Sequence, residues 1–142
     1  LACQTDLLAT FAEMFHINLS DNEGEDSFSF LPVLKNPLTG RSGRNAIVHK
    51  NSKGYLAYRE GPWKLFLGKN EKGENTYELY NLDDDIQEQH NLYGQYPPLQ
   101  EKLENSLTEA IVNGRTSPGE VQLNDTENLW DQLFWLKNKN IP

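Results

Sequence analysis

Basic residues in the middle of the chain are suited to bind an anion. Arg59 and Lys64 lie on either side of a short turn. A guanidinium or an ammonium group can hold an anionic group through charge-assisted hydrogen bonds. The alternative is that both residues pair with nearby carboxylates, at Glu60, Glu78 or Asp83 to Asp85, where an exposed ion pair contributes little. The sequence favours this pairing.

Three further residues could contact a ligand. Trp63 could stack on a sugar ring, but a Trp that begins a strand after Gly-Pro is more often a packing anchor. His49 and Lys50 end another apolar run. A lone His that has no Ser or carboxylate at the spacing of a catalytic site is more often structural. Both roles stay open for each residue, and the structural role is the favoured one.

Two acidic clusters carry enough oxygen atoms to suggest a cation site. Residues 20 to 26 read SDNEGED. An EF-hand loop needs a Gly at its sixth position and a Glu at its twelfth, and counting from Asp21 these positions hold Asp26 and Pro32. Asp83 to Asp85 are consecutive, so their carboxylates splay apart. We expect a solvated loop and a turn, with no metal at either.

The sequence contains no motif of an independent catalyst. It has no G-x-S-x-G elbow, no G-x-G-x-x-G, no P-loop and no C-x-x-C. The single cysteine, Cys3, cannot form an internal disulfide. The formal net charge of -8 disfavours nucleic acid as a partner. No apolar run reaches the roughly 20 residues that a membrane helix needs, so we expect no membrane partner.

Short apolar runs separated by turn residues predict an antiparallel sheet. Three runs, at Ile47 to His49, Tyr55 to Arg59 and Trp63 to Leu67, are separated by N-S-K-G and E-G-P. Thr76 to Tyr80 is a fourth candidate strand. Alternation within the runs directs one face to a core and leaves Arg59 and Lys64 in water.

Helical patterns precede the predicted sheet. Thr5 is suited to N-cap a helix that runs to about Phe15, and Asp6 suits the positive end of that helix. Its apolar residues share one face: Leu7, Leu8, Phe11, Met14 and Phe15. Ser29 is expected to cap a short turn through Leu34. Residues 36 to 45 form the expected linker and the best candidate for disorder.

Helical patterns also follow the sheet. A helix is predicted after Pro97-Pro98, ending before Gly114. Its apolar stripe should pack across the sheet: Leu99, Leu103, Leu107 and Ile111. Residues 124 to 136 are rich in apolar residues such as Leu129 and Trp130, and a cap at Asp125 or Thr126 would allow a last short helix. That helix could dock on this sheet or on another domain.

Several phrases, in order, resemble the C-terminal subdomain of the type I sulfatases, the arylsulfatase family. The central one, H-x-x-x-x-G-[FY]-x-A-x-R-x-G-x-W-K-L, begins at His49, and L-Y-[ND]-L-x-x-D-x-x-E-x-x-N-L begins at Leu79. The opening CQTDLLATFAEMFHINL, the stretch DSFSFLPVL and the later RTSPG with Asn124-Asp125 are similar to further phrases of that family. The resemblance covers most of the chain.

The resemblance implies the fold and the division of the chain. The fold is α+β, a small antiparallel sheet of about four strands with a C-terminal helix packed across it and a helical lead segment before it. Residues 1–45 would be the helical lead and linker, at the end of a catalytic domain, and residues 46–142 the C-terminal subdomain. The expected partners are the N-terminal catalytic domain of the same protein and, through it, a sulfate ester. A periplasmic or extracellular bacterial location is inferred from the family only.

The resemblance also implies what the chain lacks. Sulfatases use a formylglycine made from the Cys or Ser of C/S-x-P-x-R, and this sequence has no such motif. The family's calcium site and its catalytic Lys and His residues belong to an earlier segment. We therefore expect a fragment that holds no catalytic residue, with Ca²⁺ and formylglycine supplied by the rest of a parent enzyme. In the family, the strand ends of this subdomain lie near the cleft, so the possible substrate-rim residues are His49, Lys50, Arg59, Trp63 and Lys64.

Two other functions stay open. The chain could be a standalone module that binds sulfated glycans through its basic and aromatic residues, which would require them to share one face of the folded sheet. It could instead be a structural light chain that stays attached to a catalytic partner. A large exposed apolar patch on the flanking helices would favour the light chain.

Overall fold

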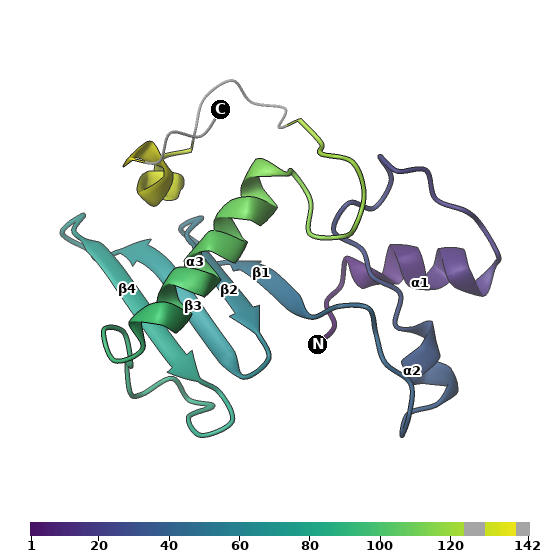
Figure 1. Cartoon of the computed structure of the whole chain (residues 1–142), viewed down its shortest axis with the longest axis horizontal. Coiled ribbons are helices and arrows are strands. Elements are labelled where there is room, and N and C mark those ends of the chain that lie inside the picture. The colour runs from purple at the N-terminus through teal and green to yellow at the C-terminus, as the bar shows by residue number, and fades with distance from the viewer. Residues whose placement is uncertain (124–129, 139–142) are drawn as a thin grey trace. The chain divides into compact units, whose positions relative to one another are not determined.

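The computed structural model describes residues 1–123 and 130–138, which form two compact units. The first unit combines Leu1–Ile47 with a later segment that begins at Ala110, and the second is built around Val48–Glu109 with the C-terminal helix. In chain order the elements are α1 (Asp6–Met14), α2 (Leu31–Lys35), β1 (Ala46–Lys50), β2 (Leu56–Glu60), β3 (Trp63–Lys69), β4 (Asn75–Asn81), α3 (Pro97–Val112) and the 3-10 helix η1 (Asp131–Asn138) (Figure 1).

The sheet has four strands in the order β1-β2-β3-β4, as the apolar runs predicted. β2 pairs antiparallel with β3, and β3 pairs antiparallel with β4. The β2–β3 register places Tyr58 opposite Leu65, and the β3–β4 register places Leu65 opposite Leu79. Because side chains alternate along a strand, these three lie on the same face of the sheet. β3 and β4 extend beyond the predicted runs because their pairing continues to Lys69 and Asn75, whereas β2 is shifted by one residue from the predicted run.

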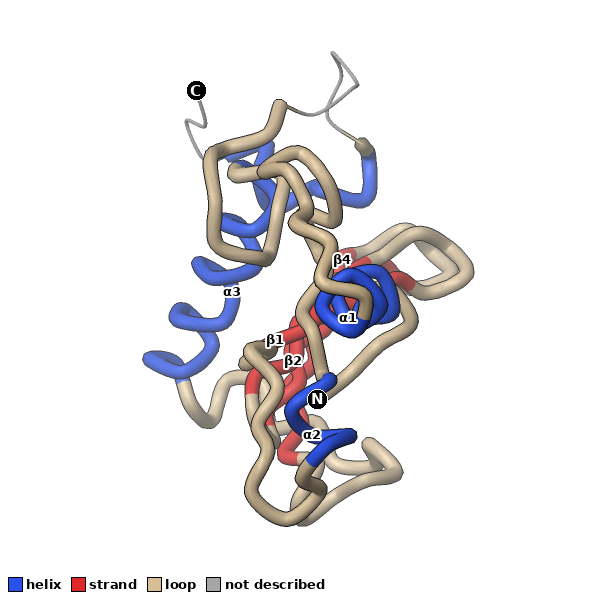
Figure 2. The backbone as a smooth tube through the Cα atoms, turned by 90° about the vertical axis from the view of Figure 1, so that its right-hand side faces the viewer, coloured by secondary structure: helices blue, strands red, loops and turns tan. Residues whose placement is uncertain are grey.

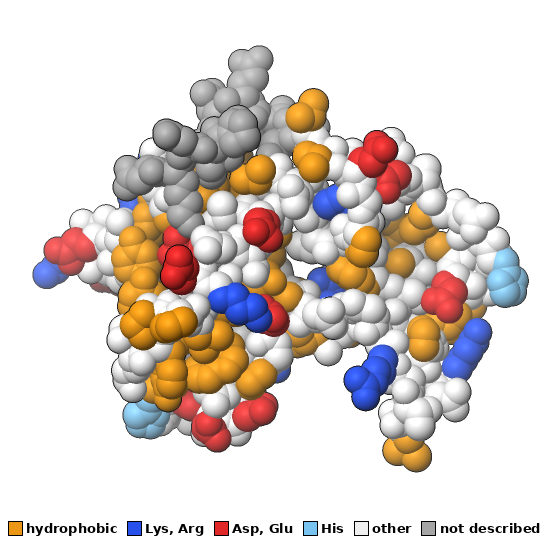
Figure 3. Space-filling view, viewed as in Figure 1, with side chains coloured by type: hydrophobic (Ala, Val, Ile, Leu, Met, Phe, Trp, Pro, Cys, Tyr) orange, Lys and Arg blue, Asp and Glu red, His pale blue; other side chains and the backbone are white. Residues whose placement is uncertain are grey.

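Helix α3 lies along one face of this sheet in both views of the backbone (Figures 1 and 2). Leu103 and Leu107 of the predicted stripe are almost completely buried, as are Leu65, Leu67 and Leu79 in the strands. The second unit therefore has the α+β arrangement expected from the sequence. Space-filling shows hydrophobic side chains gathered around the start of α3 and the neighbouring strands (Figure 3).

Gly114 ends α3 as predicted, and the structure shows why a glycine is needed there. Its φ is +62°, and the Arg115 N–H donates to the Ala110 carbonyl at 3.2 Å, which is the Schellman pattern. A Cβ on Gly114 would lie 2.2 Å from the Gln122 carbonyl oxygen. Any other residue would have to move this backbone segment.

Helix α1 spans nearly the range that the sequence predicted, but its start differs in detail. Thr5 has helical backbone angles and its side chain makes no cap hydrogen bond. Asp6, expected to favour the helix dipole, is instead a buried carboxylate at 1% exposure. Arg44 donates from Nε to Asp6 Oδ2 at 2.9 Å, and the N–H groups of Cys3 and Phe28 also donate to Asp6.

This ion pair anchors the end of the predicted linker. Residues 36–45 were the best candidate for disorder, yet Arg44 is 6% exposed and holds Asp6. Arg44 also donates to the Ala46 carbonyl at 3.0 Å, and its guanidinium lies 4.6 Å from the centre of the Phe28 ring. A charged residue in a polar stretch shows no periodicity, so this contact could not be predicted from the sequence pattern.

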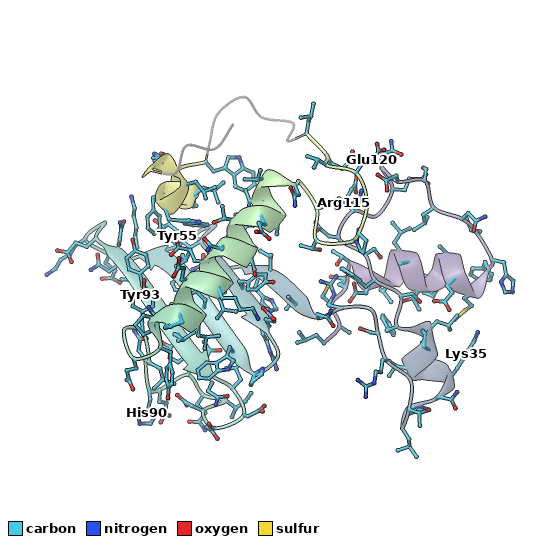
Figure 4. The ribbon with its side chains drawn as sticks, viewed as in Figure 1. Lys35, Tyr55, His90, Tyr93, Arg115 and Glu120 are labelled. Atoms are coloured by element: carbon cyan, nitrogen blue, oxygen red, sulfur yellow. The ribbon has the colours of Figure 1, made fainter. Side chains whose placement is uncertain are left out.

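The acidic loop of residues 20–26 is largely exposed, as expected of a solvated loop, and it also makes structural contacts. Arg115 donates from Nη1 to Asp21 Oδ2 at 3.0 Å and to the Glu120 carbonyl at 2.9 Å. Arg115 and Glu120 lie together in the loop after α3 (Figure 4). Thr116 donates to Asp26 through its N–H and its hydroxyl, at 3.0 and 2.8 Å. The loop therefore joins the RTSPG segment within the first unit.

The short α2 helix and the C-terminal helix follow the expectations in part. Ser29 Oγ accepts a hydrogen bond from the Leu31 N–H at 3.2 Å, but the helix N-cap is Phe30. In the second unit, Leu133 to Leu136 of η1 are buried, and the Phe134 ring lies 6.1 Å from the Tyr77 ring of β4. The last helix thus packs on this sheet. The predicted caps at Asp125 and Thr126, with Asn124 and Leu129, lie outside the described residues.

Candidate functional site

The five predicted rim residues all lie on or beside the sheet, but the structure does not bring them together on one face. Trp63 and Leu65 are two positions apart on β3, so their side chains lie on the same face of the sheet. This is the face that α3 covers. Arg59 and Lys64 form a cross-strand pair on the opposite face. His49 and Lys50 are consecutive at the end of β1 and so point to opposite faces.

Lys64 is held by a carboxylate. Its Nζ lies 2.7 Å from both carboxylate oxygens of Glu88, and the two side chains are only 24% and 34% exposed. The sequence favoured an ion pair and named Glu60, Glu78 or the acidic turn, so the kind of contact is confirmed and the partner is different. Glu88 has φ +57°, which for a residue other than glycine is uncommon. The loop after β4 therefore turns back to place Glu88 over the sheet.

Tyr80 lies beside Lys64 on the same face, in the cross-strand register of β3 and β4. Its hydroxyl donates to Glu78 at 2.9 Å. Burial, the Glu78 hydrogen bond and the charges of Glu78, Glu88 and Asp85 raise the pKa of Tyr80 to about 12. This face therefore gathers the carboxylates of Glu78 and Glu88 around the Lys64 ammonium group, beside the Arg59 guanidinium. Sequence reasoning missed Tyr80 and Glu88, although both stand within the LYNLDDDIQEQHNLY phrase.

Arg59 makes a local contact. Its Nε donates to the Gly61 carbonyl at 3.1 Å, across the turn between β2 and β3. Gly61 has φ +57°, which suits a glycine in a two-residue hairpin turn. The guanidinium thus lies at the turn, whereas the neighbouring Glu60 pairs with Lys102 of α3 at 2.7 Å.

Trp63 packs against another aromatic residue. Its ring centre lies 5.3 Å from that of Tyr96, at an interplanar angle of 57°. Tyr96 immediately precedes α3 and is 44% exposed. Trp63 therefore links the start of β3 to the start of the helix, which is the anchoring role that the sequence favoured. Tyr96 is the residue that would join it in any aromatic contact with a sugar.

His49 and Lys50 are exposed at the end of β1. The Lys50 ammonium lies 5.8 Å from the centre of the Trp130 ring, within the range of a cation–π contact. Lys53 in the following turn accepts a hydrogen bond at its carbonyl from Gln132 at 3.4 Å. The end of β1 is thereby joined to the start of η1.

The acidic turn has the local bonds expected of a turn. The Asp83 N–H donates to Asn81 Oδ1 at 3.2 Å, and Asp84 accepts from the Asn81 amide at 2.6 Å. Asp85 accepts from the His90 N–H at 2.8 Å, and backbone N–H donors at Gln89 and His90 lower the pKa of Asp85. In residues 1–123 and 130–138 no three His, Cys, Asp or Glu side chains gather as a metal ion would require.

Comparison with known proteins gives similarity in structure and not in sequence. The sequence matches no protein-family model and no curated protein. The structure is similar to a Bacteroides thetaiotaomicron sulfatase labelled BT33336S-sulf, solved in work on metabolism of multiple glycosaminoglycans, with a TM-score of 0.62 and 24% identity. It is also similar to the sulfatase BT4656, solved in complex with its substrate D-glucosamine-2-N,6-O-disulfate, with a TM-score of 0.55 and 21% identity.

The extent of these matches is as informative as their scores. They cover 75% and 74% of this chain but only 24% and 23% of the two sulfatase chains. No helix in the described part of the chain is long and apolar enough to cross a membrane. The chain thus has the fold of part of a sulfatase, as the resemblance in sequence implied, and spans about a quarter of the length of such a protein.

Proposed function

We propose that this chain is the C-terminal part of a sulfuric ester hydrolase, completing its fold and shaping the rim of its substrate cleft. The observation that carries the proposal is the match of three quarters of the chain to a quarter of two sulfatases. The ordered phrases around His49 and Leu79 support the same family. In this proposal the bond-breaking groups lie elsewhere in the parent.

The cofactors of the parent would not be held by this chain. Its sequence has no C/S-x-P-x-R motif from which a formylglycine could be made. Asp21, Asp26 and Asp85 accept hydrogen bonds from protein donors, and no three His, Cys, Asp or Glu side chains gather among the described residues. Both observations support this part of the proposal. Ca²⁺ and formylglycine would therefore belong to the preceding part of the parent, outside the cell or in the periplasm.

A sulfated sugar is the substrate class that we propose for the parent. One of the two similar sulfatases was solved with a disulfated glucosamine as its substrate. The exposed residues of the predicted rim are His49 and Lys50, which could reach such a sugar, while Arg59 is half-buried. Trp63 and Tyr96 offer an aromatic surface on the face that α3 covers. Lys64 could contribute only if it left Glu88, because that carboxylate already occupies its ammonium group.

The rim residues do not support a standalone glycan-binding module. Such a module needs a basic face lined by aromatic rings, whereas Trp63 lies on one face of the sheet and the Arg59–Lys64 pair on the other. The exposed apolar side chains of α1 agree better with a chain that stays joined to a larger partner. The light-chain function differs from our proposal only in whether the parent is cleaved.

The test is sulfate release by the parent and by the 142-residue chain. We expect the parent, expressed with its formylglycine formed, to release sulfate from a 6-O-sulfated glucosamine. The chain alone should release none, with or without added Ca²⁺. Metal-dependent turnover by the pure chain would contradict the proposal, as would a parent that releases no sulfate from any aryl or sugar ester.

The rim is tested by His49→Ala in the parent. Because His49 is exposed at a strand end, we expect an unchanged Tm and a change of about threefold to tenfold in kcat/KM for one sulfated sugar relative to another, the scale of one hydrogen bond. His90→Ala, another exposed histidine, is the matched control and should leave this ratio unchanged. Identical kinetics on every substrate would make His49 a structural residue.

A further inference from the structure

Trp130 is an exposed indole beside a lysine side chain. It is 50% exposed, and the Lys50 ammonium lies 5.8 Å from the centre of its ring. The two other tryptophans differ, because Trp63 packs on Tyr96 and Trp135 is only 6% exposed. A cation–π contact at an exposed site is weak. A ligand that offers both groups better partners can therefore replace it.

The turn that carries Lys50 into β2 has a fixed backbone. Asn51 Oδ1 accepts hydrogen bonds from the N–H groups of Lys53 and Tyr55, both at 3.0 Å. The Asn51 N–H donates in turn to the Tyr55 carbonyl, also at 3.0 Å. The turn therefore presents the exposed side chains of Lys50 and Lys53 from a hydrogen-bonded backbone.

The indole is held from the other side by η1. The Leu133 N–H donates to the Trp130 carbonyl at 2.9 Å, which ties Trp130 to the first turn of this helix. Leu133 to Leu136 are buried, so η1 itself is anchored. Gln132 Nε2 donates to the Lys53 carbonyl at 3.4 Å and joins the helix to the turn. Both sides of the site are thus in place before a ligand arrives, which lowers the entropy cost of binding.

Positive charge gathers around η1, although the whole chain has a formal net charge of -8. Four lysines lie on η1 or beside it, namely Lys50, Lys53, Lys69 and Lys137. The one carboxylate of η1, Asp131, pairs with Lys137 at 2.9 Å. Among the described residues neither Lys50 nor Lys53 has a carboxylate partner. Two ammonium groups beside the indole are therefore left for an anion.

We propose that Trp130, Lys50 and Lys53 bind a sulfated sugar, with the indole stacked on the ring and the ammonium groups on sulfate oxygens. Ligand sites combine aromatic surface with a few charged groups, and an ammonium group donates charge-assisted hydrogen bonds to such an anion. The choice of a sugar rests on the proposed function and would make this one contact of the parent's cleft. Trp130 and Lys53 were not among the predicted rim residues.

The indole N–H signals of the chain test this contact, because there are only three tryptophans. Titration of the isotope-labelled 142-residue chain with D-glucosamine-2-N,6-O-disulfate, followed by NMR, should shift the Trp130 signal to saturation. The signals of Trp63 and Trp135 should stay in place and report an intact fold. Trp130→Phe identifies the signal that moves.

Lysine variants test the ammonium groups in the same titration. Lys50→Gln combined with Lys53→Gln should weaken binding about tenfold, the scale of one charge-assisted hydrogen bond. Lys72→Gln is the matched control, because Lys72 is an exposed lysine of the β3–β4 turn. It should leave the Kd unchanged. An equal loss in the control would overturn the contact, because the effect would then follow from net charge alone.

The outcomes separate this inference from the proposed function, because binding is measured and not sulfate release. A Trp130 signal that stays fixed would overturn the contact, even if the parent is an active sulfatase. An equal shift with sodium sulfate at the same ionic strength would also overturn it, because the sugar ring would then add nothing. A saturable shift alongside a parent that releases no sulfate would support the contact and remove only the proposed activity.

Discussion

The two units of this chain are stabilised by different kinds of contact. In the second unit five leucines of the sheet and α3 are at most 1% exposed, and large polar side chains stay near the surface. In the first unit the buried groups include Asp6, Arg44 and Arg115, while the large apolar side chains of α1 are exposed. One unit closes its own apolar core. The other is organised around charges and leaves the apolar side chains of α1 exposed.

The difference suggests where each unit is vulnerable. Burial of apolar surface is insensitive to which charges are present. A buried ion pair contributes little net stability when intact, but removal of one partner leaves an uncompensated charge and is strongly destabilising. The first unit should therefore be the more sensitive to single charge changes and to acid.

The largest expected effect is that of Arg44→Ala. It leaves the Asp6 carboxylate buried without its guanidinium, which should cost about 3–5 kcal/mol of unfolding free energy. Hydrogen exchange of peptides from residues 5–34 should rise, while tryptophan fluorescence, which reports the second unit, should change little. Arg41→Ala, an exposed arginine in the same segment, is the control. A small effect on exchange would mean that the pair does not organise the first unit.

A second expected effect is that of Leu107→Ala, which should cost about 2–5 kcal/mol because it opens a cavity between α3 and the sheet. Leu107 is completely buried. Ile86→Ala is the matched control, because Ile86 is 73% exposed. Denaturant unfolding followed by tryptophan fluorescence measures the loss. If exchange in residues 5–34 rose equally, the two units would unfold together and the comparison would fail.

The smallest expected effects come from changes of pH. Acid should destabilise the first unit, and alkali should destabilise the second. Burial alone raises the pKa of Asp6, but hydrogen bonds from Arg44, Cys3 and Phe28 and the Arg44 charge outweigh it and lower the pKa below 3.8. A lowered carboxyl pKa stabilises the fold above about pH 4, and that stability is lost as pH falls through the folded value. Acid should therefore expose the first unit in hydrogen exchange.

Alkali should act on the second unit instead. The raised pKa of Tyr80, about 12 against an ordinary 10.0, stabilises the fold below pH 10 and is lost as pH rises from 10 towards 12, on the order of 2–3 kcal/mol. Tyr58 and Tyr93 in the same unit also have raised pKa values, mainly because of burial. Tyr80→Phe should reduce the alkaline loss seen by fluorescence. An unchanged profile would assign the loss to other groups.

Much of the second unit could be predicted from the sequence. Period-two alternation around Leu65 and Leu67 and four-residue spacing of Leu103 and Leu107 identify strands and helix, because the same residues that repeat are the ones buried. Gly114 marks the helix end because its positive φ favours a glycine. The rim residues were harder, since Lys64 and Glu88 are separated by 24 positions and nothing local indicates their pairing.

The sequence by itself determined the antiparallel sheet with its covering helix and the resemblance to a sulfatase, because periodicity and ordered phrases are local properties of the chain. Only the tertiary structure decided that Asp6 pairs with Arg44, that Arg115 binds the acidic loop, and that the apolar side of α1 faces outward. These contacts join residues 38 and 94 positions apart. Amphipathic spacing shows that a helix has an apolar face, but the fold of the whole chain decides which face is buried.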